Sequence, residues 1–349
     1  MKDSDILKKI DNRSTGIGSV PHTDVDSICD LIIEKSPEIP YWPQFANIDA
    51  RESMLLQYSE NLPCLKLNLD KNDILYNSED RDKELLKFYE MLTSNNIDYF
   101  RISPDFARGF YTLLEKLKQC ENRFIKGQVT GAVTFLYSII GEEGKSVIYD
   151  DNLSDAIIRG LAMKAVWQAK EIRKFGKLPI IFFDEPSLSG FGSAFMSLEK
   201  ETVISIFNKL ISTVREHDEA LLGIHCCGNS DWEMLLGSGI DILNFDSYGY
   251  VENFVLYPAS IKSFLERGGI IAWGAVPTSE YSDDISLDDV YIKLKTAFNN
   301  LEEKGIKREL LKSSLFTPSC GLGTLDQGIA NEVIKLNFDL AQRMKDYCN

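Results

Sequence analysis

A histidine and a cysteine stand two residues apart at the end of an apolar run: His225 and Cys227 are followed directly by a Gly-Asn pair. Cys320 has a similar setting, because it follows an apolar run and precedes a glycine. Both contexts are typical of a strand that ends in a tight turn. Thiolates and imidazole are ligands that suit Zn(II). The residue types therefore predict a zinc site made of His225, Cys227 and Cys320.

Strand geometry supports this grouping. Successive side chains of a strand point to opposite faces, so His225 and Cys227 share a face while Cys226 points away. A fourth candidate ligand is Asp246, at the end of the sixth predicted strand, where it follows Ile-Leu-Asn-Phe. Catalytic zinc sites have three protein ligands and keep a further position for water or substrate. The alternative is a packed cluster of thiols without metal, because buried cysteines are common.

A carboxylate follows a very apolar run at another predicted strand end. Asp184 and Glu185 come directly after Ile-Ile-Phe-Phe, and a carboxylate placed there needs a partner. We expect Asp184 to act in catalysis and to hold a substrate ammonium, with Glu185 pointing elsewhere. His22, just after the first predicted strand, is a second catalytic candidate that would line the site; the alternative is a loop histidine.

Three more polar or aromatic residues lie where predicted strands end. Ser19 stands in a glycine-containing stretch whose amides and hydroxyl suit a carboxylate, although a tight turn alone also explains the glycines. Gln128 and Trp273 belong to the third and seventh predicted strands. We expect Ser19, Gln128, Asp184 and Trp273 to bind substrate, because the carboxyl ends of parallel strands meet at one edge.

Short apolar runs alternate with longer amphipathic stretches, which is typical of βαβ units. Strands are predicted near 15–20, 39–45, 123–130, 178–185, 220–227, 241–247, 269–276 and 313–319. Helices are predicted over 25–35, 105–119, 153–174, 198–216, 260–267, 287–303 and 326–347. Eight strands favour a single (β/α)8 TIM barrel over 1–349, rather than an open doubly wound sheet. Residues 46–122 exceed one crossover, so we expect an inserted segment between strands 2 and 3 that caps the barrel mouth.

Charge and composition exclude some classes of function. With 38 basic and 53 acidic residues among 349, the net charge is -15, which opposes binding to nucleic acid or anionic membranes. No apolar run approaches the roughly 20 residues of a membrane span, and the first residues do not resemble a signal peptide. Seven cysteines without an export signal favour free or metal-bound thiols. We therefore expect a cytoplasmic protein.

These motifs together resemble those of a known family. The chain looks like the catalytic barrel of the cobalamin-independent methionine synthase family and of the related zinc methyltransferases of the uroporphyrinogen decarboxylase superfamily. The resemblance spans nearly the whole chain and is carried by Gly18-Ser19-Val20-Pro21, Gly127-Gln128-Val129-Thr130-Gly131, Asp184-Glu185-Pro186, His225-Cys226-Cys227-Gly228-Asn229 and Pro318-Ser319-Cys320-Gly321-Leu322.

The resemblance implies a ligand set and a reaction. In such enzymes a histidine, two cysteines and often an acid hold a zinc ion that binds a thiol substrate as a thiolate. This implies His225, Cys227 and Cys320 as ligands, with Asp246 where the family usually has glutamate. It also implies that Asp184 binds the amino group of an amino-acid substrate and that Ser19 lies in the substrate site.

We therefore expect a zinc-dependent methyltransferase that moves a methyl group to or from a thiol resembling homocysteine or coenzyme M. The His-x-Cys-Gly-Asn form is closer to corrinoid-dependent methyltransferases, which favours a methyl-corrinoid protein or a cobamide as partner. Three alternatives remain: a folate-dependent methionine synthase-like enzyme, a uroporphyrinogen decarboxylase-like enzyme, and a barrel with structural zinc. A decarboxylase would need a basic cluster for several carboxylates, and structural zinc would need a fourth firm ligand.

Overall fold

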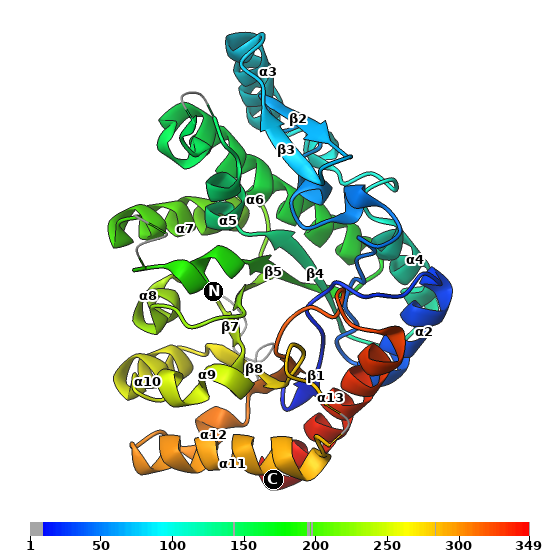
Figure 1. Ribbon diagram of the computed structural model, residues 1–349, viewed down its shortest axis with the longest axis vertical. Helices are drawn as coiled ribbons and strands as arrows, with labels where there is room; N and C mark the ends of the chain where they lie inside the picture. Colours follow the sequence, from blue (N-terminus) through cyan, green and yellow to red (C-terminus); the bar gives the residue numbers. More distant parts are fainter. Residues whose placement is uncertain (1–9, 142–143, 194–195, 197, 283, 349) are drawn as a thin grey trace.

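A curled parallel sheet forms the centre of the molecule, which we describe from a computed structural model (Figure 1). The structure describes residues 10–141, 144–193, 196, 198–282 and 284–348. Within these residues the sheet has seven strands in the order β1-β9-β8-β7-β6-β5-β4, each parallel to its neighbours. Their bounds are Arg13–Ser14 (β1), Phe124–Thr130 (β4), Leu178–Asp184 (β5), Leu221–Cys226 (β6), Ile242–Phe245 (β7), Ile270–Val276 (β8) and Ser314–Pro318 (β9).

Strands β4 to β9 lie within one or two residues of the positions expected from the sequence. Their residues are almost all buried, as expected for a parallel sheet with both faces covered. The first strand differs, because pairing in β1 covers only Arg13 and Ser14 rather than 15–20. After Thr15, whose amide donates to the carbonyl of Phe316, the chain leaves β9 and turns toward a different neighbour.

That neighbour is the segment 40–44, which is bonded to the edge strand β4 on one side and to the chain after β1 on the other. The amide of Trp42 donates to the carbonyl of Lys126 on β4, at 3.0 Å. On the other side, the amide of Gln44 donates to the carbonyl of Gly18, also at 3.0 Å. These contacts are isolated bridges rather than a continuous strand, so the expected strand 39–45 does not form as a regular element. Two prolines within the segment lack the N–H that a ladder requires.

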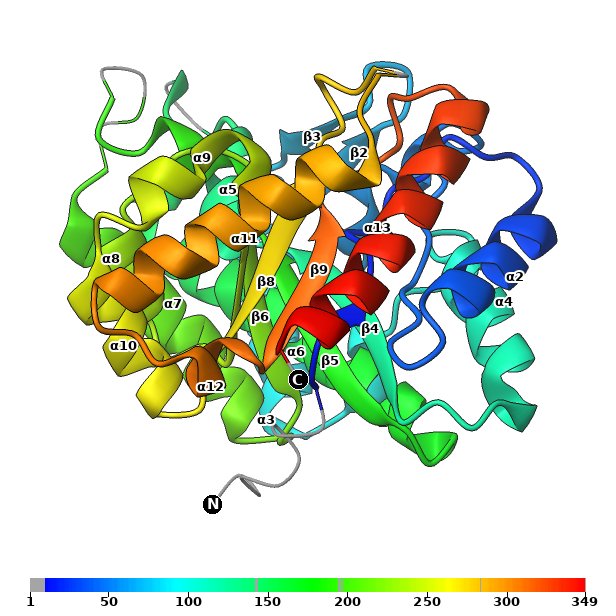
Figure 2. The ribbon, with the colours of Figure 1, turned by 90° about the horizontal axis from the view of Figure 1, so that it is seen from below.

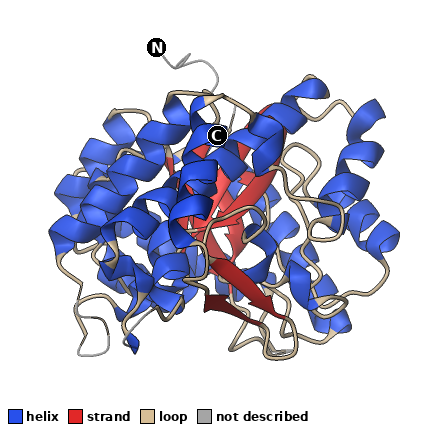
Figure 3. Ribbon diagram, turned by 90° about the horizontal axis from the view of Figure 1, so that it is seen from above, coloured by secondary structure: helices blue, strands red, loops and turns tan. Residues whose placement is uncertain are grey.

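Helices cover the outer face of the sheet, as Figures 2 and 3 show. The α-helices are α2 (Val25–Lys35), α3 (Arg81–Thr93), α4 (Arg108–Lys116), α5 (Ala132–Ser138), α6 (Asp151–Lys174), α7 (Lys200–Arg215), α8 (Trp232–Gly237), α9 (Ser247–Phe254), α10 (Pro258–Glu266), α11 (Leu287–Glu303), α12 (Arg308–Leu311) and α13 (Gln327–Cys348). Short 3₁₀ helices are η1 (Ala50–Glu52), η2 (Leu56–Tyr58), η3 (Ile97–Phe100), η4 (Leu117–Gln119), η6 (Val147–Tyr149) and η7 (Pro186–Gly190).

Local sequence signals account for several helix starts. Asp24 accepts a hydrogen bond from the amide of Ser27 at the start of α2, and Asp150 does the same for Leu153 in α6. Ser286 forms a capping box at the start of α11. The helices predicted over 25–35 and 287–303 correspond to α2 and α11, and the observed bounds are the predicted ones. None of the helices in the described part of the chain is long and apolar enough to cross a bilayer.

Residues 46–122 form a separate excursion between the segment 40–44 and β4. It contains an antiparallel hairpin, β2 (Leu65–Asn68) with β3 (Asp73–Tyr76), which lies with α3 away from the central sheet (Figure 1). The excursion packs on α6, where Gly160 leaves room for its side chains: an added Cβ would lie 2.2 Å from the side chain of Leu62. This contact anchors the excursion to the helical layer.

The inner face of the sheet is apolar at one end and polar at the other. Ile180, Leu221, Ile242 and Leu315 belong to a small buried cluster to which no helix contributes. Because residues two apart share a face, the same strands then present polar residues further along. These buried residues are Lys126, Gln128, Asp184, His225, Asn244 and Thr317. The polar end therefore lies at the carboxyl ends of the strands.

Candidate metal centre

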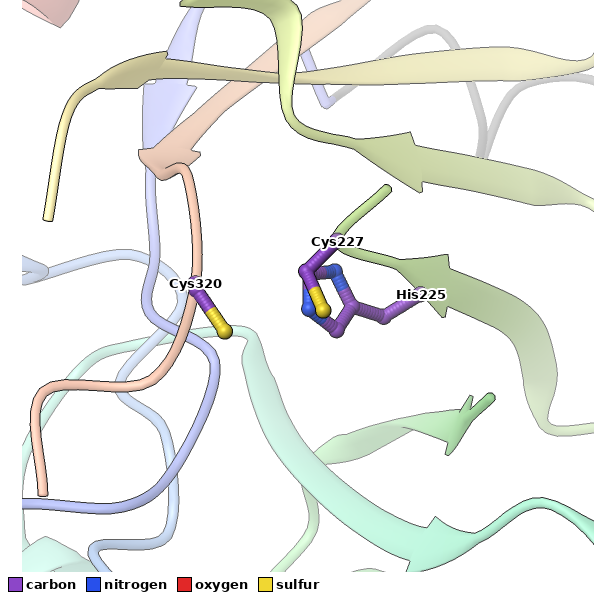
Figure 4. Close-up of side chains that lie close together, drawn as sticks. All are labelled: His225, Cys227 and Cys320. Carbon is purple, nitrogen blue, oxygen red and sulfur yellow. The ribbon is translucent and has the colours of Figure 1, made fainter. Parts of the chain in front are cut away.

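His225, Cys227 and Cys320 come together at the polar end of the sheet (Figure 4). His225 belongs to β6, Cys227 follows β6 directly, and Cys320 follows β9. One ligand atom from each, an imidazole nitrogen or a Sγ, lies within 4.8 Å of the other two. Figure 4 shows the imidazole and both sulfurs directed toward one space. The structure thus brings together the three residues that the sequence analysis grouped.

Cys226 lies on the opposite face of β6, as the alternation of side chains requires. It is fully buried in the core between the sheet and the helices, and its thiol donates to the carbonyl of Gly228 at 3.6 Å. Burial raises the pKa of Cys226 to about 11. It is therefore a neutral core thiol beside the group and not a member of it.

The donor atoms fit a zinc ion. The Nδ1 of His225 is 2.5 Å from the Oδ1 of Asn244, whereas its Nε2 is buried and has no hydrogen-bond partner among the described residues. A buried nitrogen of this kind costs free energy unless something binds it. Zinc bonds of about 2.0–2.3 Å in a tetrahedral arrangement separate ligand atoms by about 3.5–3.8 Å. The observed ligand atoms lie within 4.8 Å of one another, about 1 Å above that spacing at most.

The contact between the two sulfurs shifts their pKa values in opposite directions. Cys227 lowers the pKa of Cys320 to about 4, burial opposes this shift, and His225 adds to it. The pKa of Cys227 is correspondingly raised, first by its contact with Cys320 and then by burial. For His225, burial alone would lower the pKa, but the Cys320 sulfur and the Asp184 carboxylate outweigh it and raise that pKa. The contact with Cys227 and His225 therefore favours the thiolate form of Cys320, which is the form that binds metals.

Asp246 lies outside the group of His225, Cys227 and Cys320. Its carboxylate caps helix α9 by accepting a hydrogen bond from the amide of Gly249 at 2.8 Å. Such a cap stabilises a helix by about 1 kcal/mol, which accounts for the orientation of this side chain. Burial raises the pKa of Asp246. The structure therefore gives Asp246 a structural role and does not bring it to the three ligand atoms.

A pocket of about 230 Å³ opens directly onto the three side chains. Four segments far apart in the sequence form its walls: the chain after β1, the start of the excursion, the end of β5, and the turn after β9. Its lining residues are Ile17, Ser19, Gln44, Ala46, Glu52, Met54, Asp184, Pro186, His225, Cys227, Cys320, Gly321, Gly323 and Thr324. Among them there is no lysine or arginine.

Asp184 is the carboxylate of this pocket that has a free oxygen. It ends β5 next to His225 on β6, and its Oδ1 is buried without a hydrogen-bond partner in the described part of the chain. Burial raises the pKa of Asp184 to about 6, against the charges of Lys126 and His225, which lower it. The Lys126 ammonium is itself occupied, since it donates to the carbonyl of Ile17 at 2.6 Å. Asp184 is therefore placed to pair with a cationic ligand.

Glu185 points away from the pocket, as the sequence analysis expected. Its carboxylate accepts hydrogen bonds from the amides of Val133 and Thr134, at 3.0 and 2.7 Å, where helix α5 begins. Burial raises the pKa of Glu185 to about 7, although these hydrogen bonds lower it. The adjacent carboxylates thus differ in role. Glu185 accepts hydrogen bonds at the start of α5, whereas Asp184 faces the pocket.

Ser19 lines the pocket and also ties two loops together. Its Oγ accepts a hydrogen bond from the amide of Gly323 at 3.3 Å, and its carbonyl accepts one from Leu322 at 2.9 Å. The turn that carries Cys320 therefore packs on the chain after β1. Gly321 is required there, because an added Cβ would lie 2.2 Å from the Oγ of Ser19.

Besides Asp246, three expected site residues do not line the pocket: Trp273, Gln128 and His22. Trp273 packs against Phe254 and Phe298 on the helix side of β8, so its indole faces away from the site. Gln128 is fully buried on the inner face, where its amide donates to the carbonyl of Trp42 at 3.0 Å. The expectation that Trp273 and Gln128 contact the ligand is not met by this geometry.

His22 is likewise separate from the pocket lining. Its Nε2 is 2.9 Å from the Oδ1 of Asn331 on α13, so the ring packs between the chain after β1 and that helix. This contact gives no route to the three ligand atoms. The catalytic role expected for His22 therefore has no support from its position.

The excursion supplies pocket residues that the sequence analysis did not identify. Glu52 and Met54 line the pocket, and Thr130 at the end of β4 donates its hydroxyl to the carbonyl of Met54 at 2.5 Å. The carboxylate of Glu52 is buried and pairs with Arg108 of α4. No sequence motif marks these residues. The one signal was the surplus length of 46–122, which indicated a segment near the barrel mouth.

Comparisons with known proteins add resemblances of fold. The sequence matches no model of a known protein family. It also matches no curated protein sequence. Among solved structures, the chain is similar to a B12-independent methionine synthase from Shewanella sp. W3-18-1 in complex with selenomethionine. The identity is 18%, the match covers 67% of this chain and 67% of that one, and the TM-score is 0.44.

Two further solved structures are glycosidases. One is a GH20 catalytic module of the pneumococcal exo-β-D-N-acetylglucosaminidase StrH, with 10% identity over 96% of this chain and 86% of that one, at a TM-score of 0.49. The other is a double mutant of the Cellulomonas fimi endo-β-1,4-mannanase, with 14% identity over 99% of this chain and 72% of that one, at a TM-score of 0.43. At these TM-scores the resemblances carry no argument about function, which has to come from the site itself.

Proposed function

We propose that this protein is a zinc-dependent methyltransferase that moves a methyl group to or from a thiol. The observation that carries the proposal is the meeting of His225, Cys227 and Cys320, each with a ligand atom within 4.8 Å of the others, at the bottom of an open pocket. An imidazole and two thiolates are a donor set for Zn(II). Three protein ligands beside a pocket leave room for an exogenous ligand, whereas structural zinc sites are closed by four.

Zinc held there would lower the pKa of a bound thiol and supply a thiolate at neutral pH without a general base. The chain's own residues would bind and orient the substrate. Asp184 offers the free Oδ1 to an ammonium group, and its position beside His225 supports a small molecule that carries both an ammonium and a thiol. Ile17, Met54 and Pro186 provide apolar wall around it.

The charges of the pocket favour one class of thiol. Asp184 and Glu52 are both acids, and none of the described lining residues is a lysine or arginine. The sulfonate of a coenzyme M-like thiol would therefore find no cation in the pocket. It would instead lie near the unpaired carboxylate of Asp184. An amino thiol of the homocysteine type fits better. The same absence of basic groups disfavours a porphyrinogen decarboxylase, whose substrate carries several carboxylates.

The methyl partner must approach from outside. The pocket, at about 230 Å³, is too small to enclose a corrin ring, so a methyl-corrinoid protein or a cobamide would present its methyl group at the mouth. We further propose that segment 40–44 acts as the second strand of a closed (β/α)8 barrel, and that residues 46–122 are an insertion that caps the mouth through Glu52 and Met54.

Binding of two small thiols to the zinc-loaded protein tests the proposal. We expect homocysteine to bind at least tenfold more tightly than 2-mercaptoethanesulfonate by calorimetry, since each paired charge is worth about 1.5–3 kcal/mol. Asp184→Asn should remove most of this preference without loss of bound zinc, because the variant keeps all three metal ligands. Equal binding of both thiols by the parent protein would contradict the assigned substrate class. Absence of binding by any thiol would contradict the function.

A further inference from the structure

Asn244 lies beneath the candidate metal ligands and contacts three strands at once. It belongs to β7, directly beside His225 on β6, and its side chain is fully buried. Its Oδ1 is 2.5 Å from the Nδ1 of His225. Its Nδ2 is 2.8 Å from the carbonyl oxygen of Ala272 on β8 and 2.9 Å from the Oγ1 of Thr317 on β9.

These contacts determine which way round the amide lies. The carbonyl of Ala272 can only accept a hydrogen bond, so the amide nitrogen of Asn244 has to face it. The opposite orientation would place two acceptor oxygens 2.8 Å apart in a buried space. The amide oxygen of Asn244 therefore faces His225, and it too can only accept. The proton between Asn244 and His225 has to sit on the Nδ1 of the histidine.

The same reasoning determines whether the other ring nitrogen, Nε2, carries a proton. When Nδ1 of a neutral imidazole carries the proton, Nε2 has a free electron pair. This Nε2 is buried, has no hydrogen-bond partner in the described part of the chain, and faces the space shared with Cys227 and Cys320. A metal-binding histidine whose second nitrogen donates to a fixed acceptor has its tautomer and ring orientation set in advance.

We propose that Asn244 is a positioning residue that sets His225 in the metal-binding tautomer before any ion arrives. The inference rests on the metal site of the proposed function. Asn244 also links the two strands that lead to metal ligands. The Asn244 side chain contacts His225 on β6 and Thr317 on β9, and Cys320 follows β9. One side chain thus couples the orientation of the imidazole to the position of the strand that leads to the second thiolate.

The first test reads the tautomer directly, in metal-free protein. Long-range ¹H–¹⁵N correlation spectra distinguish a protonated Nδ1 from a protonated Nε2, and only three histidines need assignment, with His225→Gln identifying the signal. At a pH where the ring is neutral, we expect His225 to carry its proton on Nδ1. A proton on Nε2 in the unaltered protein would overturn the inference, whatever the variants do.

Variants separate positioning from simple packing. Asn244→Leu keeps a similar volume but offers no acceptor, so we expect loss of the Nδ1–H tautomer and about 10–100-fold weaker zinc binding by chelator competition. Asn244→Asp keeps an acceptor for Nδ1–H and should retain the tautomer, although it loses the donor to Ala272 and should therefore lower the free energy of unfolding. Thr317→Val removes one of the two acceptors of the Asn244 amide but leaves Ala272, so it should also retain the tautomer. Unchanged tautomer and affinity in Asn244→Leu would refute the inference.

Failure of the wider proposal gives a different pattern. If the unaltered protein carries Nδ1–H but binds no zinc, the proposed metal function is wrong while the tautomer assignment stands. If it binds zinc and Asn244→Leu binds it equally well, the metal site stands and the positioning role is wrong. Should Asn244→Leu fail to fold, the tautomers of the unaltered protein and of Asn244→Asp still decide the question.

Discussion

His225, Cys227 and Cys320 could be grouped from the sequence because each ends an apolar run before a turn, and because residues two apart on a strand share a face. Their meeting in space agrees with that reasoning. Asn244 could not be identified in the same way. An asparagine inside an apolar strand has no motif, and its role emerges only when the register places it beside His225.

The adjacent residues Cys226, which ends β6, and Cys227, which follows it, provide a matched test of the ligand assignment. Cys227→Ala should lose most bound zinc, because it removes a ligand, whereas Cys226→Ala should keep about one zinc per chain. Cys226 is buried on the helix side, so its replacement should instead lower the free energy of unfolding by about 0.5–3 kcal/mol. Metal analysis after dialysis and denaturant unfolding measure the two effects. Equal zinc loss in both variants would contradict the assignment.

Trp273 shows how a residue can be assigned to the wrong face. Its position near a predicted strand end suggested a substrate contact, but Ala272 belongs to the inner cluster, so Trp273 must face the helices. A fully apolar strand has no alternation of polar and apolar residues from which to read the faces. The pairing of β8 with β7 and β9 therefore determines which of its side chains face the helices, and its own sequence does not.

Among the elements, the long helices were the most predictable and the short ones were missed. Helices α2 and α11 have their expected bounds, with clear caps and amphipathic patterns. Helices α5, α8 and α9 have eight residues or fewer, so they offer too few turns for a helical period to show. Of these, α9 matters for the site, because its cap explains the orientation of Asp246.

The turn after β9 is the element on which the second thiolate depends. Gly321→Ala should strain this turn, since the new Cβ would lie 2.2 Å from the Ser19 Oγ, and overpacking of this kind costs about 1–3 kcal/mol. Adding Ser19→Ala should recover much of that loss, because the Ser19 Cβ is 3.5 Å away. Thermal unfolding of both single variants and the double variant measures the coupling. A double variant no more stable than Gly321→Ala would show that the two loops do not touch.

The whole molecule follows the alternation of strands and helices that the sequence predicted, in a curled parallel sheet. What the pattern could not reveal is the form of the segment 40–44 beside β4, because this segment contains two prolines and forms isolated bridges. The excursion 46–122 was visible only as surplus length. Its hairpin and its pocket residues depend on long-range contacts, such as that between Glu52 and Arg108, which no local pattern encodes.

Hydrogen exchange tests whether the barrel is closed. The amides of Trp42 and Gln44 donate to backbone carbonyls of β4 and of the chain after β1, so a closed barrel should protect them nearly as well as the amides of β5. The amide of Leu69, in the exposed turn of the β2–β3 hairpin, serves as a fast-exchanging reference. Exchange of Trp42 and Gln44 at the rate of Leu69 would show that the sheet is open at this edge.

X-ray absorption at the zinc edge tests the central claim most directly, because it counts the atoms bound to the metal. For untagged protein we predict near-stoichiometric zinc with two sulfurs, one imidazole nitrogen and one lighter atom. Adding homocysteine should introduce a third sulfur at about 2.3 Å. Protein without zinc, or a coordination shell that no thiol changes, would contradict a thiol-activating centre at His225, Cys227 and Cys320.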